Sequence, residues 1–187
     1  MTASRDDGAR PESSELQRRV IDTLRVVPDF PSPGIRFQDI TPVLGDAALF
    51  DAVVRAMADP WRTDVVTHVA GIESRGFILA APVALALGAG FIPIRKPGKL
   101  PSHTAGMDYA LEYGSDRLEM HVDACDASSR VLVLDDVLAT GGTARAACAL
   151  VESVGAVVVG CGFLLEIAAL LGRERLSSRM LTTLVVR

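Results

Sequence analysis

The chain lacks several features that mark common classes of protein. Basic residues are not in excess: the formal net charge of the 187 residues is −4, whereas a general nucleic-acid surface would be basic. Cysteines are few, and the spacing of Cys125, Cys148 and Cys161 is not that of metal ligands. We therefore expect a reduced, cytoplasmic protein with no nucleic-acid partner, whose cysteines serve as small core residues.

Long apolar runs are also missing. Residues 1–14 are polar, lack the apolar core of a secretory signal, and are predicted to be a disordered tail. The run from Ile78 to Ile94 is interrupted by Pro82, Gly88 and Pro93, which favours a helix and a strand over a membrane span. No repeat or linker divides the remainder, so residues 15–187 are predicted to form one domain.

Three motifs of nucleotide sites and hydrolases are absent. The chain has no Gly-x-x-x-x-Gly-Lys-Ser/Thr loop, no Gly-x-Gly-x-x-Gly opening a helix, and no Gly-x-Ser-x-Gly. The histidines His68, His103 and His121 do not have the spacing of metal ligands. A P-loop, a dinucleotide site, a serine hydrolase and a histidine metal site are therefore disfavoured.

The most informative stretch that is present runs from Val131 to Arg145. Its apolar start, Val131 to Leu134, is typical of a parallel strand buried on both faces. Asp135 and Asp136 follow where that strand is expected to end. After them come the loop Ala139-Thr140-Gly141-Gly142-Thr143 and a predicted helix from Ala144 to Val154.

A strand, a glycine-rich loop and a helix start together form an anion site. Glycines let backbone N–H groups approach a phosphate, and the helix dipole favours its charge. The two carboxylates would repel a phosphate, so they are better placed to accept hydrogen bonds from sugar hydroxyls or to lie near a divalent cation. The stretch predicts a sugar phosphate ligand, and an ordinary acidic turn before a helix is the alternative.

Two further loops repeat this arrangement. A strand predicted at Val65–Ala70 leads into residues 71–77, which include Ser74 and Arg75, and a strand at Phe91–Ile94 leads into Arg95, Lys96 and Lys99. Alternating strands and helices predict an α/β fold with a mostly parallel sheet. Ligands bind at the carboxyl ends of such strands, so the three loops are expected at one edge, with a solvated surface loop as the alternative for each.

The other segments frame this sheet. Residues 28–45 are rich in proline and are predicted to form an irregular, rigid segment, whose Phe30, Ile35 and Phe37 either line a pocket or fasten the segment to the core. Residues 100–108 lack periodicity and are predicted to be a mobile lid, followed by a hairpin over 109–122 with its turn at 114–116. We also expect helices at 16–26 and 47–59, the second capped by Asp46, and strands at 156–163 and 181–186.

The stretch from Val131 to Thr143 resembles the phosphoribosyl-diphosphate signature of the type I phosphoribosyltransferases, which is paired acids followed by Ala-Thr-Gly-Gly-Thr. Residues 30–44, 71–77, 95–101 and 111–114 resemble the adenine phosphoribosyltransferase family. The resemblance implies a mostly parallel central sheet flanked by helices. It also implies a small N-terminal hood at about residues 28–45 and a β-hairpin lid at about residues 96–122. It implies that a homodimer converts adenine and 5-phosphoribosyl 1-diphosphate to AMP and diphosphate with Mg²⁺, in purine salvage.

The resemblance also implies a role for each site residue. The donor's 5-phosphate and ribose would be held by Asp135, Asp136, Ala139, Thr140, Gly141, Gly142 and Thr143, and the leaving diphosphate by Ser74, Arg75, Arg95, Lys96 and Lys99. Adenine would stack on Phe37, with backbone groups around Ile35 and Arg36 reading its edge. Glu112 would be the general acid/base near N7, with Tyr113 beside it on the lid. Mg²⁺ would be held mainly by substrate, with Asp135 and Asp136 nearby.

Two alternatives remain open. The same chemistry on hypoxanthine or xanthine is disfavoured by Leu111-Glu-Tyr-Gly114, because a 6-oxopurine site usually has a lysine near O6. A regulator with this fold but no catalysis would carry a DNA-binding module, for which the 27 residues before Pro28 are too few. Gln38 departs from the family pattern, in which an arginine is expected beside the stacking aromatic.

Overall fold

The computed structural model describes residues 11–111 and 114–187, which form two compact units divided between Val53 and Val54. The predicted hood lies within the first unit. We describe the two units separately. Within the described residues, none of the helices combines the length and the hydropathy of a membrane-spanning segment.

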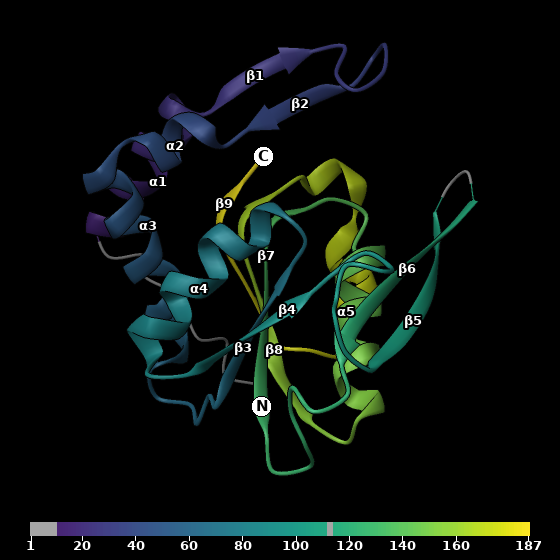
Figure 1. Ribbon diagram of the computed structural model, residues 1–187. Helices are drawn as coiled ribbons and strands as arrows, with labels where there is room; N and C mark the ends of the chain where they lie inside the picture. The colour runs from purple at the N-terminus through teal and green to yellow at the C-terminus, as the bar shows by residue number, and fades with distance from the viewer. Residues whose placement is uncertain (1–10, 112–113) are drawn as a thin grey trace, which may run out of the picture. The chain divides into compact units, whose positions relative to one another are not determined.

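The first unit combines short helices with a two-stranded antiparallel sheet (Figure 1). Its elements are α1 (Pro11–Thr23), β1 (Arg25–Pro28), β2 (Arg36–Asp39), α2 (Thr41–Gly45) and the first half of α3 (Ala47–Ala58). Asp46 caps α3 as predicted, because its Oδ1 accepts the backbone N–H groups of Ala48 and Leu49, both at 3.0 Å.

The predicted helix over residues 16–26 is displaced. Helix α1 begins at Pro11, inside the predicted tail, and ends at Thr23. Val26 and Val27 instead belong to β1 and pair with Gln38 and Phe37 of β2. The β-branched side chains favour a strand, and Pro28 disfavours helical geometry at the residue before it.

The second unit is built on a five-stranded sheet with the order β4-β3-β7-β8-β9, in which every paired strand is parallel. This confirms the predicted α/β class with a parallel sheet. Figure 1 shows α4 and α5 on opposite faces of the sheet. The elements in chain order are η1 (Asp59–Trp61), β3 (His68–Ile72), α4 (Arg75–Leu87), β4 (Gly90–Ile94), β5 (Thr104–Leu111), β6 (Gly114–His121), β7 (Arg130–Leu138), α5 (Gly142–Ser153), β8 (Val157–Glu166), η2 (Ala168–Leu170), η3 (Gly172–Leu176) and β9 (Leu181–Val186).

The hairpin β5–β6 is longer than predicted. Its register runs from Thr104 opposite His121 to Leu111 opposite Gly114, so part of the predicted lid is strand, and Asp116, predicted in the turn, lies in β6. Leu118 and Met120 are fully buried in the cluster that also contains residues of α5. Cross-strand pairing and this packing, rather than local periodicity, determine where the hairpin begins.

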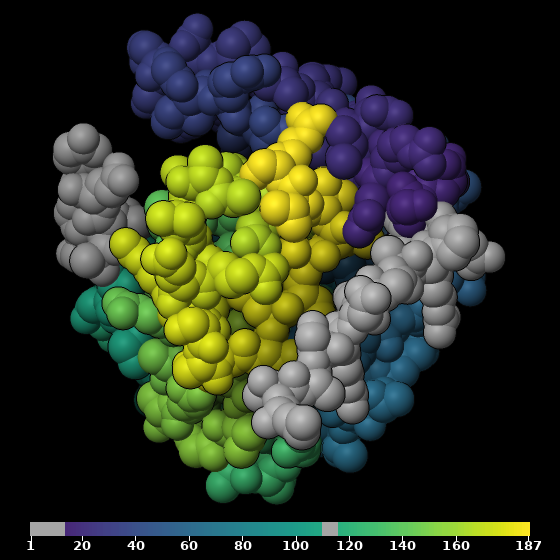
Figure 2. Space-filling view, turned by 180° about the vertical axis from the view of Figure 1, so that it is seen from behind, coloured from purple at the N-terminus to yellow at the C-terminus, as the bar shows by residue number. Residues whose placement is uncertain are grey.

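The core of the second unit is tightly packed around the sheet. A Cβ added at Gly160 would overlap the buried ring of Trp61, which accounts for the predicted close packing at that glycine. The three cysteines are free and buried, and the Sγ atoms of Cys148 and Cys161 are 3.4 Å apart. The last residues of the chain, coloured yellow in Figure 2, form part of the surface on the β9 side, where β9 is the edge strand.

Candidate active site

The three predicted anion loops lie at one edge of the sheet. Strands β4, β3 and β7 are direct neighbours and run in parallel, with Ala70 paired to both Ile92 and Val133. Their carboxyl ends therefore point the same way, and the segments that follow them lie side by side. This confirms the arrangement predicted from the alternation of strands and helices.

The loop after β7 is shorter than predicted. The ladder with β8 continues past the two acids, pairing Val137 with Leu165, so β7 ends at Leu138 and not at the acids. Helix α5 begins at Gly142, which leaves Ala139, Thr140 and Gly141 as the loop and puts Thr143 in the first helical turn. The first N–H groups of a helix have no acceptor within it, so this turn faces the loop with donors suited to a phosphate.

Gly141 must be glycine for two reasons. Its φ is 77°, in the left-handed region, and a Cβ there would overlap the carbonyl oxygen of Gly172. Gly172 is equally confined, since its own Cβ would overlap the carbonyl oxygen of Ala139. The start of η3 thus packs directly against the loop formed by residues 139–141. Sequence reasoning did not assign this role to Gly172.

An ion pair fixes η3 in this position. Arg173 Nη2 lies 2.6 Å from Glu166 Oε2 and Arg173 Nε lies 3.1 Å from Oε1, which joins η3 to the end of β8. The hydrogen bonds from Arg173 lower the pKa of Glu166 below its ordinary value, despite the opposing effect of burial. While Glu166 is charged, this ion pair therefore stabilises the position of η3 against the loop before α5.

Glu166→Gln is expected to change how stability depends on pH. A lowered pKa in the folded state gives stability that is present above the ordinary value of 4.5 and is lost as the pH falls through the folded value. Because Arg173 is half exposed, we expect the variant to be less stable by at most about 1 kcal/mol at pH 7, with the difference shrinking as the pH falls through the folded pKa of Glu166. Thermal melts from pH 3 to pH 7 measure this, with the exposed Glu174→Gln as control; a constant difference across that range would contradict it.

The two acids of β7 have different environments. Asp136 is buried, and its Oδ2 lies 2.5 Å from Arg75 Nε in an ion pair that joins the β7 end to the first turn of α4. Burial and the neighbouring carboxylate of Asp136 raise the pKa of Asp135 well above its usual value. A Cβ at Gly76 would lie 2.7 Å from Asp135 Oδ1, so only glycine lets α4 begin this close to the acids.

The loop after β4 is held by Glu73, which directly follows β3. Glu73 Oε2 accepts the Lys96 backbone N–H at 2.9 Å and Arg95 Nε at 3.3 Å, and Oε1 accepts Lys99 Nζ. Burial raises the pKa of Glu73, but the bonds from Lys99 and Lys96 and the charges of Lys99 and Arg95 outweigh it and lower that pKa. Three predicted diphosphate-binding residues are thus organised around one carboxylate.

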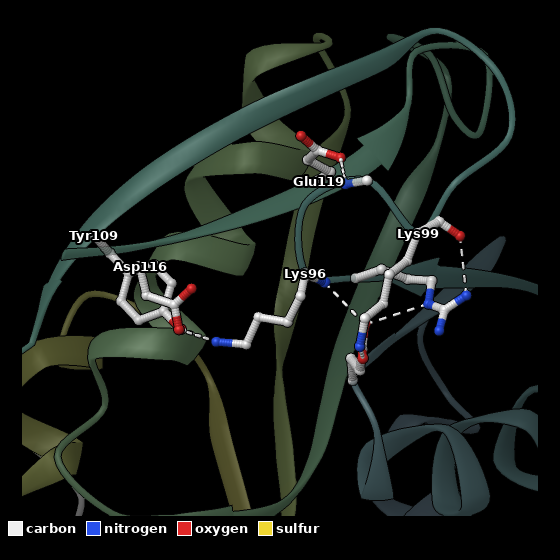
Figure 3. A network of polar contacts seen from close by, with 8 residues as sticks. Lys96, Lys99, Tyr109, Asp116 and Glu119 are labelled. Carbon is white, nitrogen blue, oxygen red and sulfur yellow. Dashed lines mark hydrogen bonds and ion pairs between the residues drawn. The ribbon is translucent and has the colours of Figure 1, made fainter.

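The Lys96 side chain points away from Glu73, toward the hairpin (Figure 3). Its Nζ contacts Asp116 Oδ2 and lies 3.1 Å from the hydroxyl of Tyr109. Sequence reasoning missed Glu73, Asp116 and Tyr109 as partners of the cations. Glu73 lay next to the predicted Ser74 and Arg75, but no local signal identified the two hairpin residues.

The predicted adenine-binding residues belong to the first unit. Ile35 and Arg36 are exposed, while Phe37 is half-buried and its ring meets that of Phe30 edge-on, with centroids 5.0 Å apart. Gln38 Oε1 is buried and has no hydrogen-bond partner among the described residues. Glu112 and Tyr113, the predicted acid/base and lid residues, lie outside the described residues.

The described side chains do not form a metal site of their own. Within residues 11–111 and 114–187, no three side chains of His, Cys, Asp and Glu come together as metal ligands. Asp135 and Asp136 nevertheless fit an ion shared with a substrate, because Mg²⁺ commonly takes one or two carboxylates together with phosphate oxygens and water.

The site combines three loops suited to anions with paired acids near the end of β7, at one edge of a parallel sheet, as expected of a transferase of phosphorylated sugars. The family model of the phosphoribosyl transferase domain matches residues 46–183. The chain therefore belongs to the phosphoribosyl transferase family. An adenine phosphoribosyltransferase of Myxococcus xanthus (strain DK1622) is 57% identical over 162 residues, which cover 87% of this chain and 88% of that protein. Both sequence and structure place the chain in the adenine phosphoribosyltransferase branch of the family.

Solved structures agree. Adenine phosphoribosyltransferase from Rhodothermus marinus DSM 4252 superposes with a TM-score of 0.90 at 48% identity, over 93% of this chain and 99% of that one. The Saccharomyces cerevisiae enzyme, solved with adenine and an imino-altritol bisphosphate, gives a TM-score of 0.86 at 37% identity, over 91% of this chain and 99% of that one. The fold is therefore that of the type I phosphoribosyltransferases, as predicted.

Proposed function

We propose that this chain transfers the phosphoribosyl group of 5-phosphoribosyl 1-diphosphate to adenine, forming AMP and diphosphate in purine salvage. The observation that carries the proposal is the Arg75–Asp136 ion pair, which joins the acidic strand end to the loop expected to hold the leaving group. The two loops follow neighbouring parallel strands, so one ligand can contact both. The adenine specificity of the relatives favours adenine over hypoxanthine or xanthine.

The donor's 5-phosphate is assigned to the loop before α5. Backbone N–H groups from Thr140 to Thr143 and the two threonine hydroxyls supply donors, and Gly141 keeps the loop open to a phosphate. Asp135 and Asp136 accept hydrogen bonds from the ribose hydroxyls, with Asp136 oriented by Arg75. Charge-assisted hydrogen bonds of this kind are about twice as strong as neutral ones.

The leaving diphosphate is assigned to Ser74, Arg75, Arg95, Lys96 and Lys99. As the bond between C1 and the diphosphate breaks, negative charge develops on the leaving group and positive charge on the ribose. Cations fixed beforehand stabilise that separation without reorganising, which is the main source of catalysis in such sites. Glu73 supplies the fixed positions, since it binds the loop's backbone as well as two of its side chains.

The base is assigned to Phe37, Ile35 and Arg36, and the proton transfer to Glu112. Phe37 offers a ring face for stacking, and backbone groups near Ile35 and Arg36 offer hydrogen bonds to the edge of adenine. When N9 bonds to C1 the purine must lose one proton, and the Glu112 carboxylate would accept it from N7 of the N7–H tautomer of adenine. Tyr113, next to Glu112, is assigned to the lid that excludes water.

Mg²⁺ is proposed as the cofactor. When bound, the ion supplies positive charge to the diphosphate oxygens of the donor. Asp135 and Asp136 are the carboxylates that would share it with the substrate. The raised pKa of Asp135 in the ligand-free protein is consistent with a carboxyl that needs a positive partner before it ionises fully.

The decisive experiment offers the protein its donor with Mg²⁺ and a panel of adenine, guanine, hypoxanthine and xanthine. We expect AMP and diphosphate in equal amounts from adenine, and turnover at least about 100-fold lower with the 6-oxopurines, because mismatched polar groups would be left unpaired. Chelation of Mg²⁺ is expected to stop turnover. Equal use of hypoxanthine, or no nucleotide from adenine, would refute the proposal.

A homodimer is proposed from an exposed apolar face of the second unit. Leu85 on α4 is 83% exposed, Ile78 lies on the same helix, and Phe91 lies on the edge strand β4. Apolar side chains clustered on an edge of a sheet are typical of a surface covered by a partner. Burial also protects β4 from pairing with unrelated strands.

Leu85→Glu is expected to weaken the dimer. Burying a leucine contributes about 2 kcal/mol, and losing that much raises the dissociation constant about 30-fold. Light scattering coupled to size-exclusion chromatography at micromolar concentration measures the molar mass. Val157→Glu, at a 49% exposed apolar position on β8, is the matched control and is expected to leave the mass unchanged. An unchanged mass for Leu85→Glu would remove this face from the interface.

The cytoplasm is proposed as the location. The three cysteines are buried and unpaired although two of their sulfurs are 3.4 Å apart, which fits a reducing compartment.

A further inference from the structure

The hairpin β5–β6 holds the ammonium group of Lys96. Tyr109 and Asp116 are cross-strand partners, so their side chains lie on one face of the hairpin. Lys96 Nζ contacts Asp116 Oδ2, lies 3.1 Å from the Tyr109 hydroxyl and lies 5.6 Å from the centroid of its ring. The Tyr109 hydroxyl also donates to Asp116 Oδ2 at 3.1 Å. Figure 3 shows the lysine reaching from the loop after β4 to this pair.

Three carboxylates therefore hold the loop after β4, and they do so in two ways. Glu73 is 9% exposed and accepts the backbone N–H of Lys96 together with Arg95 and Lys99, and Glu119 Oε2 accepts the Gly98 N–H at 3.0 Å. The bonds to the backbone N–H groups of Lys96 and Gly98 fix the loop backbone. Asp116 is 26% exposed and contacts this loop through the Lys96 side chain, at the end of a flexible four-carbon stem.

The Lys96 ammonium can therefore exchange partners while the loop backbone stays in place. A diphosphate carries more negative charge than one carboxylate, and moving the lysine head requires rotation of side-chain bonds without disturbing the backbone bonds to Glu73. The Lys96–Asp116 pair is released first, because Asp116 is more exposed than Glu73 and exposed ion pairs are weak in water.

We propose that Asp116 is a positioning residue that holds Lys96 on the hairpin in the empty enzyme and competes with the diphosphate group for it. This inference rests on the proposed function, in which Lys96 binds diphosphate. Binding of the donor takes the ammonium from Asp116 and so removes the link between the hairpin and the loop.

The test replaces Asp116 with asparagine, which keeps the shape and removes the charge. With its competitor gone, Lys96 is expected to bind inorganic diphosphate and the donor about fivefold more tightly, with the KM for adenine unchanged. Asp116→Glu restores the charge and is expected to return the affinity toward the original value. Asp108→Asn is the matched control, since Asp108 is a 72% exposed carboxylate on the same hairpin paired with Arg117.

Isothermal titration with magnesium diphosphate and steady-state kinetics measure both affinities. Weaker or unchanged diphosphate binding by Asp116→Asn, or an equal change in Asp108→Asn, would overturn the inference. Lys96→Ala distinguishes failure of this inference from failure of the proposed diphosphate site, because this variant is expected to weaken diphosphate binding by itself. In the Lys96→Ala background, Asp116→Asn is expected to change nothing further, and a persistent effect would show that Asp116 acts through another group. AMP formation by the unmodified protein tests the proposed function independently.

Discussion

Replacing Asp135 and Asp136 together with asparagine is expected to lower donor affinity by at least about 100-fold. Each hydrogen bond to a charged group contributes about 1.5–3 kcal/mol, so two lost together correspond to this factor or more. The double variant also removes the partner of Arg75 and the carboxylates proposed to share Mg²⁺ with the substrate. Titration with the donor in the presence of Mg²⁺ measures the loss. Normal turnover by the double variant would remove the acids from the site.

The single variants serve as internal controls, because their effects on stability are expected to be opposite. The pKa of Asp135 is raised in the folded state, so the fold favours the protonated carboxyl. The stability that this gives is present below the unfolded pKa and is lost as the pH rises through the folded pKa, where the charged carboxylate opposes folding. Asp135→Asn in the ligand-free protein should therefore melt at a higher temperature than the unmodified protein at pH 7. Asp136→Asn should melt lower, since it breaks the ion pair with Arg75.

Glu112→Gln is expected to lower turnover by roughly 100-fold while leaving the KM for the donor nearly unchanged. General acid/base catalysis contributes about 100- to 10,000-fold, and glutamine keeps the size of the side chain without its proton chemistry. The pH–rate profile is the more specific measurement: the limb that reports the carboxyl should disappear from kcat.

A matched control separates chemistry from disturbance of the hairpin. Asp123→Asn, an exposed acid just beyond β6, is expected to keep both the rate and the profile. Turnover of Glu112→Gln at the original rate would exclude Glu112 from the mechanism. A loss of donor affinity equal to the loss of rate would indicate that the residue binds the donor instead.

Much of the second unit was predictable because its signals are local. The apolar run before Asp135, the glycines of the following loop and the left-handed Gly88 that ends α4 each specify structure within a few residues. Parallel pairing then brings the carboxyl ends of β4, β3 and β7 together without further information from the sequence. The arrangement of the three loops at one edge of the sheet follows from these features alone.

What the sequence did not reveal depends on contacts between distant segments. Gly172 packs against the loop before α5 from about 30 residues further along the chain, and Asp116 meets Lys96 from 20 residues away in sequence. The end of β7 was misplaced because acids commonly stop a strand, whereas the ladder with β8 carries this one on to Leu138. Tertiary pairing overrides local preference in both cases.

The packing of Trp61 against Gly160 has a practical consequence. It is the only tryptophan in the chain, and its indole is fully buried within the second unit. The intrinsic fluorescence of the protein therefore reports on one place, the contact between η1 and the middle of β8. A red shift of the emission on heating records the opening of the parallel sheet, and events confined to residues 11–53 contribute no tryptophan emission of their own. The melts described for Glu166, Asp135 and Asp136 can be followed this way in the unlabelled protein.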